Sequence, residues 1–156
     1  MPDLFPGIRI GGSDDYVELR VEDGILHAEA VGSATGAEAR RALAEGLQQG
    51  WLRLSMPTLV DMTRFTGSID WGAMRDIAAM APWGQPGDAP ASPPSRVAYV
   101  TRDSLFSLIL KLMAAIFPHA RHRAFPDRDG ALRWLRQPRP ATAGRQPVMA
   151  AAPPEA

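Results

Sequence analysis

The chain has 156 residues, of which 46% are hydrophobic, enough to bury one core but too few for two large domains. Lys plus Arg equals Asp plus Glu at 17 each, so no overall field attracts nucleic acid or an anionic membrane, and we expect no nucleic-acid partner. The absence of cysteine excludes disulfides, thiol nucleophiles and Cys-ligated metal sites.

No secretion signal is recognisable at the start of the sequence, because residues 1–10 carry two prolines and an aspartate before any apolar run. The most apolar segment, Leu105–Phe117, contains Ser107 and Lys111 and is shorter than the roughly 20 residues of a membrane-spanning helix. We therefore expect a cytoplasmic protein without an integral membrane segment.

The first clear element is a β-hairpin. Tyr16–Glu22 alternates between apolar and charged residues, as a strand with one face in water does. Asp23–Gly24 follows, and Asp and Gly are both residue types that tolerate the positive φ angles of a tight type I′ turn. The pattern predicts that Ile25–Val31 returns antiparallel to the first strand.

Two helices and one strand are predicted next. Thr35 and Glu38 have capping-box spacing, so a helix begins after Thr35 and ends near Gly50. Thr58–Met62 reads as a short strand containing Asp61. Ser68 stands where an N-cap would precede a helix reaching Met80. The proline-rich stretch Pro82–Ser95 is predicted to be an exposed connection.

The rest of the sequence continues the alternation of strand and helix, which is typical of a mainly parallel sheet covered by helices. We predict an α/β fold with a mainly parallel five-stranded sheet, an N-terminal β-hairpin and four covering helices. The predicted domains are an N-terminal arm (1–14), the α/β domain (15–137) and a disordered Pro/Ala-rich tail (138–156). The last predicted elements are strands Arg96–Thr101 and Arg121–Phe125 and helices Asp103–Phe117 and Asp127–Arg136.

Several short segments occur in an order known from one protein family. They are Thr58-Leu59-Val60-Asp61, Phe65-Thr66-Gly67-Ser68, Arg96-Val97-Ala98-Tyr99-Val100, Ala124-Phe125-Pro126-Asp127 and Ala131-Leu132-Arg133-Trp134-Leu135. In this order the chain resembles the SpoIIAA-like branch of the STAS superfamily, over about Tyr16 to Gln137. The resemblance implies a regulatory, protein-binding α/β domain. The phosphorylated Asp-Ser-Ser/Thr-Gly motif of the anti-sigma-factor antagonists is absent, which fits better the uncharacterised bacterial relatives grouped with lipid-binding Sec14 proteins.

The candidate binding or regulatory surface lies in the loops after two parallel strands. Ligands and partners of open α/β sheets meet the carboxyl ends of the strands, where helix amino termini present unpaired amides. Alternatively, these side chains only bond loop amides, cap helices or lie in solvent. The residues of this surface are Asp61, Thr63, Arg64, Thr66, Ser68, Thr101, Arg102 and Ser104.

Catalysis has little support in the sequence. His27, His119 and His122 lie on predicted strand or turn positions, and none belongs to a His-Glu-x-x-His spacing. No Gly-x-Ser-x-Gly turn or phosphate-binding glycine loop occurs. We predict that the protein is not an enzyme and that it has no metal site and no cofactor.

The helix predicted over Asp103–Phe117 carries two apolar stripes, whereas a surface helix needs only one. Leu105, Ile109, Leu112 and Ile116 are assigned to the sheet. The second stripe is predicted to form a homodimer or to contact an apolar ligand, unless neighbouring helices or the tail cover it. It consists of Phe106, Leu110, Met113 and Phe117.

Two hypotheses about function follow. The first is a non-catalytic regulatory module that binds an unknown protein partner through the loops. The alternative is a carrier or sensor of a small apolar, lipid-like ligand, which requires a lined cavity beneath the helices.

Overall fold

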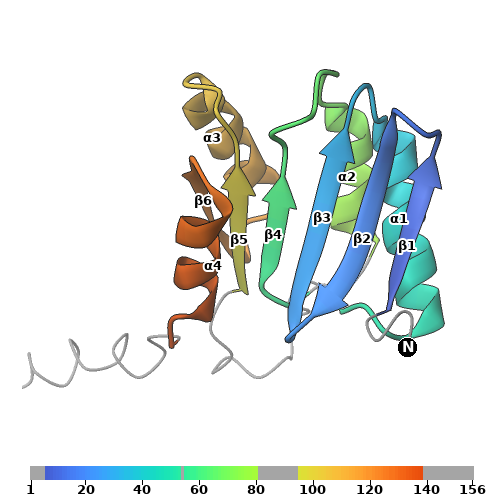
Figure 1. Cartoon of the computed structure of the whole chain (residues 1–156), viewed down its shortest axis with the longest axis horizontal. Coiled ribbons are helices and arrows are strands. Elements are labelled where there is room, and N and C mark those ends of the chain that lie inside the picture. The colour runs from blue at the N-terminus through green and yellow to red at the C-terminus, as the bar shows by residue number, and fades with distance from the viewer. Residues whose placement is uncertain (1–5, 54, 81–94, 139–156) are drawn as a thin grey trace, which may run out of the picture.

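The computed structural model describes residues 6–53, 55–80 and 95–138 of the chain (Figure 1). Six strands form one mixed sheet in which the spatial order follows the chain order, β1-β2-β3-β4-β5-β6. Four helices cover the sheet. The elements are β1 (Gly7–Gly11), β2 (Tyr16–Glu22), β3 (Ile25–Val31), α1 (Gly36–Gln49), β4 (Thr58–Asp61), α2 (Trp71–Ala79), β5 (Ser95–Val100), α3 (Phe106–Ile116), β6 (Ala120–Phe125) and α4 (Arg128–Arg136).

The predicted hairpin and the parallel arrangement after it are confirmed. Strands β2 and β3 pair antiparallel, with Tyr16 opposite Val31. Asp23 and Gly24 both have positive φ, at 55° and 74°, as a type I′ turn requires. From β3 to β6 every neighbouring pair is parallel, so the carboxyl ends of four strands lie at one edge of the sheet.

The sheet has one strand more than the sequence predicted. Strand β1, inside the segment predicted to be an arm, pairs antiparallel with β2 and forms the sheet edge. Ile8 and Ile10 pack against the core. The strand was missed because it has only five residues and begins and ends with glycine, which is depleted in strands.

The helix boundaries confirm most of the expected caps. Thr35 and Glu38 form the predicted capping box of α1, and Gly50 ends that helix at a φ of 86°. For α2 the prediction was wrong: the N-cap is Asp70, whose carboxylate accepts from the Ala73 backbone N–H at 3.0 Å, and not Ser68. Asp70 directly precedes the helix and is an equally good cap, so it displaces the start by two residues.

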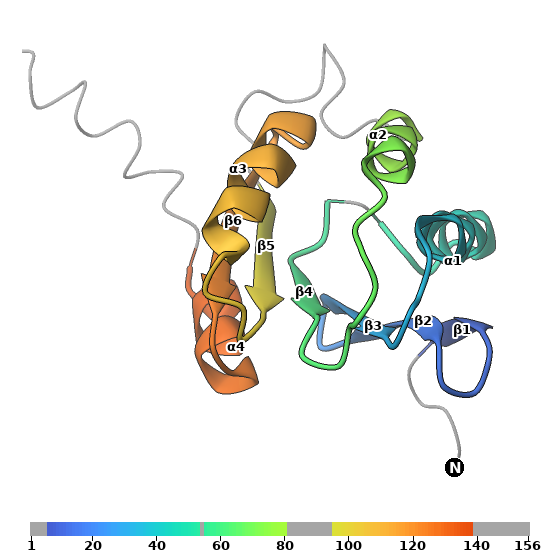
Figure 2. The same ribbon diagram turned by 90° about the horizontal axis from the view of Figure 1, so that it is seen from above.

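The helices divide between the two faces of the sheet (Figure 2). Helices α1, α2 and α3 cover one face, and α4 covers the other face over β4, β5 and β6. No helix in the described part of the chain is long and apolar enough to cross a bilayer. Residues 82–94 of the predicted connection and 139–156 of the predicted tail lie outside the described residues.

Candidate functional site

The loops after β4 and β5 lie side by side at the carboxyl edge of the sheet. The Met62 backbone N–H donates to the Val100 carbonyl at 2.9 Å, and the Thr101 N–H donates to the Phe125 carbonyl at 3.0 Å. The parallel strands therefore bring the two predicted surface segments, 61–70 and 101–104, to the same edge.

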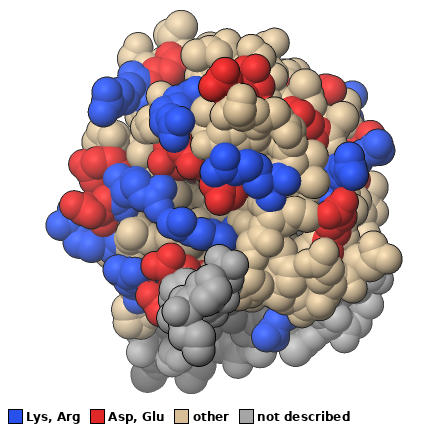
Figure 3. Space-filling view, turned by 45° about the vertical axis from the view of Figure 1, so that its right-hand side comes forward, with Lys and Arg blue, Asp and Glu red and all other residues tan. Residues whose placement is uncertain are grey.

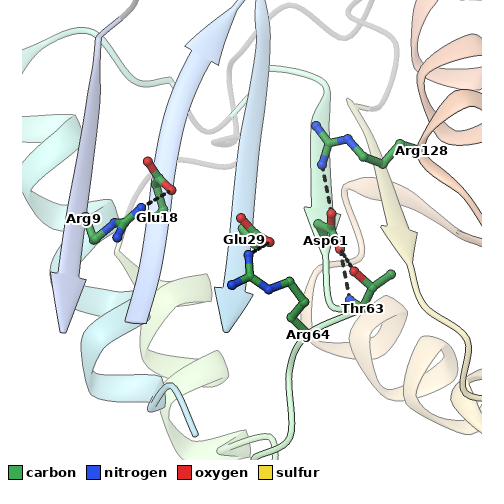
Figure 4. Close-up of polar contacts among 7 residues, drawn as sticks. All are labelled: Arg9, Glu18, Glu29, Asp61, Thr63, Arg64 and Arg128. Atoms are coloured by element: carbon green, nitrogen blue, oxygen red, sulfur yellow. Dashed lines mark hydrogen bonds and ion pairs between the residues drawn. The ribbon is translucent and has the colours of Figure 1, made fainter. Parts of the chain in front are cut away.

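Asp61 is buried and accepts three hydrogen bonds within the protein (Figure 4). Its Oδ1 accepts from the Thr63 backbone N–H at 3.0 Å and from the Thr63 hydroxyl at 2.7 Å, while its Oδ2 accepts from Arg128 Nη1 at 2.9 Å. Desolvation by burial, the largest single influence, raises the pKa of Asp61. The Thr63 hydrogen bonds and the Arg128 guanidinium together outweigh it and hold the pKa below its usual value. Asp61 thus holds the loop after β4 and helix α4 together through its carboxylate.

Two other residues of the predicted surface, Thr101 and Arg64, contact neighbouring residues of the protein. Thr101 accepts the Asp103 backbone N–H at 3.1 Å, and Arg64 pairs with Glu29 at 3.5 Å (Figure 4). The remaining four residues of the predicted surface are exposed at the edge of the sheet. They are Thr66, Ser68, Arg102 and Ser104.

The side of the sheet opposite α1 carries interspersed charges of both signs (Figure 3). Arg9 pairs with Glu18 at 3.1 Å across β1 and β2. Nearer to α4, Arg128 Nη2 donates to His27 Nδ1 at 3.2 Å. Burial, and then the charge of Arg128, lower the pKa of His27. Because the signs alternate, this face favours neither an anionic nor a cationic partner.

The structure contains a cavity of about 200 Å³ between the sheet and helices α1, α2 and α3. For comparison, an engineered apolar cavity of about 150 Å³ takes up benzene. The cavity therefore has room for a small apolar molecule. Its apolar lining comes from β2 to β6, the three helices and the loop after β4. It includes Val17, Leu19, Leu26, Ala28, Ala30, Ala34, Ala39, Leu43, Val60, Met62, Phe65, Ile69, Met74, Ile77, Val97, Met113, Phe117 and Ala120.

The cavity exists because small side chains of the central strands face the helices. The register places Ala28 of β3 beside Val60 of β4, and Val60 beside Tyr99 of β5. Ala39 of α1 also lines the space. Small residues on both the sheet and the helix leave a gap that neither side fills. The alternative hypothesis required a lined cavity beneath the helices, and the structure has one.

One polar group in the lining is a pair of aromatic side chains, Tyr99 and His122. The Tyr99 hydroxyl lies 2.9 Å from His122 Nδ1, and His122 Nε2 lies 3.0 Å from the Phe117 carbonyl oxygen. Burial lowers the pKa of His122, partly offset by the hydrogen bond to Phe117, so the imidazole is neutral at pH 7. Burial also raises the pKa of Tyr99, which keeps its hydroxyl protonated.

The assignment of the two α3 stripes was wrong in part. Phe106 is 3% exposed and packs with Met113 and Phe117 in the core, so these residues are not available to a second copy. Leu105 and Leu108 are instead exposed, at 68% and 61%. Met113 and Phe117 also line the cavity, and contact of these residues with an apolar ligand stays a prediction.

The sequence hypothesis of an apolar carrier called for a cavity, and the candidate residues named from the sequence include Ser68, Met113 and Phe117 of its lining. The sequence identified neither the other lining residues nor the Tyr99–His122 pair. Ala28, Ala30 and Val60 show no signal of their own, because a cavity follows only from the register that places them together. His122 and Tyr99 lie on two predicted strands that follow each other in the sequence, which is only a weak indication that their side chains meet. Within the described residues no group of three or more histidines and carboxylates could hold a metal ion.

No protein-family model matches the chain, and no curated protein is detectably similar to it in sequence. Among solved structures, the chain is similar to an uncharacterised protein of the DUF3478 family with a SpoIIAA-like fold from Shewanella loihica. The two are 21% identical, with a TM-score of 0.48, and the match covers 86% of this chain and 98% of that chain.

Proposed function

We propose that this protein is a non-catalytic binding protein that takes up a small apolar ligand in the cavity between the sheet and helices α1, α2 and α3. The observation that carries the proposal is the cavity itself, about 200 Å³ with an almost entirely apolar lining. The apolar lining of this partly open cavity lacks contacts that a bound apolar ligand would provide. Uptake of an apolar molecule restores those contacts.

The experiment compares the wild type with variants that fill the cavity. Ala28→Leu places three more carbons in the lining from β3, and Ala39→Leu does so from α1. Ala44→Leu adds the same three carbons at an exposed position of α1 and is the matched control. Binding of 1-octanol is measured by calorimetry, and melting curves show that each variant folds.

We expect saturable binding by the wild type and by Ala44→Leu, and at least a tenfold loss for the folded variants that fill the cavity. Native mass spectrometry of protein from its own cells would detect a copurified ligand. A wild type that takes up no apolar probe, or a folded Ala28→Leu and Ala39→Leu that bind as well as Ala44→Leu, would contradict the proposal.

A second proposal concerns the carboxyl edge of the sheet as a surface for a protein partner. It is supported by the exposed side chains Thr66, Ser68, Arg102 and Ser104, which adjacent loops bring to one edge. Arg102→Ala is expected to weaken capture of such a partner and to leave the melting temperature nearly unchanged, because an exposed charge contributes about 1 kcal/mol at most. Cavity-filling variants that retain the partner would separate this function from ligand uptake.

A further inference from the structure

The hydrogen positions in the Tyr99–His122 pair follow from its acceptors. The Phe117 carbonyl oxygen only accepts, so His122 Nε2 carries the hydrogen and donates it across 3.0 Å. In a neutral imidazole the other nitrogen, Nδ1, is then an acceptor, and the Tyr99 hydroxyl donates to it across 2.9 Å. Both hydrogens of the pair are therefore used inside the protein.

What the pair leaves for a ligand is an acceptor. The Tyr99 hydroxyl oxygen donates its hydrogen to His122 but keeps lone pairs, and both residues line the cavity. A donor placed there would extend a chain of hydrogen bonds to Tyr99, His122 and the Phe117 carbonyl, in which each bond polarises the next. A ligand that brings only acceptors finds no hydrogen at this pair.

The charges of the lining point in the same direction. Two charged residues border the cavity, Glu29 and Asp70; both are acidic, and none of the described lining residues is Lys or Arg. Glu29 alternates with Ala28 and Ala30 in β3, so its carboxylate lies on the opposite face of the sheet (Figure 4). The carboxylates are already engaged, Glu29 with Arg64 and Asp70 with the Ala73 backbone N–H. A carboxylate headgroup would lose its water in this space without gaining a cation, which is strongly unfavourable.

We propose that the ligand of the cavity is an uncharged apolar molecule with a hydroxyl group, and that this hydroxyl donates its hydrogen to the Tyr99 oxygen. The inference rests on the proposed function, since it names the class of ligand for the same cavity. It assigns Tyr99 as the residue that selects the headgroup and His122 as the residue that positions it. Medium-chain or aromatic alcohols fit the volume and the chemistry, and fatty-acid anions do not.

The test uses four probes with the same eight-carbon chain: 1-octanol, 1-chlorooctane, octanoate and octylamine at pH 7.5. We expect the wild type to bind 1-octanol at least tenfold more tightly than octanoate or octylamine, because either charged headgroup would lose its water in a mostly apolar cavity. It should also bind 1-octanol more tightly than 1-chlorooctane, which lacks a donor. In Tyr99→Phe the affinity for 1-octanol should fall about tenfold, to that for 1-chlorooctane. Tyr16→Phe, at a buried tyrosine outside the lining, is the matched control and should behave as the wild type.

The outcomes separate the inference from the function beneath it. If the wild type binds no probe, the proposed function fails and the inference fails with it. If it binds octanoate or octylamine as tightly as 1-octanol, the cavity is a binding site but the choice of headgroup is overturned. Because Tyr99 is buried, melting curves must show that Tyr99→Phe folds; a folded variant with unchanged preference for 1-octanol over 1-chlorooctane excludes Tyr99 as the selecting residue. His122→Asn gives a second variant, expected to lose the same preference.

Discussion

The two faces of this sheet are built from the same strands but packed differently. On the α4 face, Leu59 and Ala98 are fully buried together with Ala131 of the helix. On the opposite face, their neighbours Val60 and Val97 are only half-buried and border the cavity. The difference shows that close packing is a property of each face, because alternate residues of one strand face different layers.

Size complementarity explains which face is filled. On the α4 side, Ala98 and Ala131 are also small, but Leu59, Val100 and Leu135 fill the space around them. On the cavity side, alanines occur on both the strand and the helix, at Ala28, Ala30 and Ala39. Small residues opposite small residues leave volume that a ligand can occupy.

The largest expected effect on stability tests whether the residues of α3 that face the sheet are closely packed, although a cavity lies beside them. Phe106→Glu would bury a charge among Tyr99 and Met113 and should destabilise the fold by more than about 4 kcal/mol. Leu108→Glu, on the exposed side of the same helix, should change the free energy of unfolding by no more than about 0.5 kcal/mol. Urea denaturation measures both.

A well-folded Phe106→Glu would mean that the residues around the cavity are loosely packed.

Light scattering on the same proteins tests whether the protein forms a homodimer. A dimer that Leu108→Glu converts to a monomer would place the interface on the exposed leucines.

A medium effect compares adjacent residues of β4 directly. Leu59→Ala should cost about 2–5 kcal/mol, because Leu59 is enclosed on the α4 face. Val60→Ala should cost only about 1 kcal/mol, since the Val60 side chain is half-buried and already borders empty space. Equal losses in chemical denaturation would show that the cavity face is as closely packed as the other.

The smallest effect uses a histidine on each face. His27 lies beside Arg128 and His122 lies in the cavity lining, and burial lowers both pKa values below 6.5. Below about pH 6.5 the unfolded chain therefore binds more protons than the folded one, so the free energy of unfolding should fall as the pH decreases from 7 to 5. The loss of Asp61 ionisation contributes only at lower pH, because its folded-state pKa lies below 3.8.

The variants His27→Gln and His122→Gln should each flatten this pH dependence, measured as the melting temperature between pH 5 and 7. Bound 1-octanol should steepen the His122 contribution and leave that of His27 unchanged. An equal change at both histidines would remove the distinction between the faces.

The order and type of most elements could be predicted from the sequence, because they depend on local signals. Alternation in Tyr16–Glu22, the Asp23–Gly24 turn and the Thr35 capping box all act within a few residues. The α2 cap was misplaced because two capping residues, Ser68 and Asp70, stand close together, and only the folded helix distinguishes them.

The site could not be predicted in the same way, because it depends on contacts between distant residues. The period of α3 gives two apolar stripes but does not say which one faces the sheet. The bond between Tyr99 and His122 spans 23 residues and requires β5 and β6 to be parallel neighbours in one particular register. The spacing of residues along the sequence therefore does not predict this hydrogen bond.

The sequential order of the strands has a consequence for how the molecule assembles. Each strand from β2 to β6 pairs with the strand that precedes it in the sequence. During synthesis, the strand with which each new strand pairs has therefore already been made. The hairpin, whose partners are separated by a two-residue turn, can form within microseconds and serve as the template. Synthesis from the amino terminus and growth of the sheet thus run in the same direction, which shortens the time that an unpaired edge is open to aggregation.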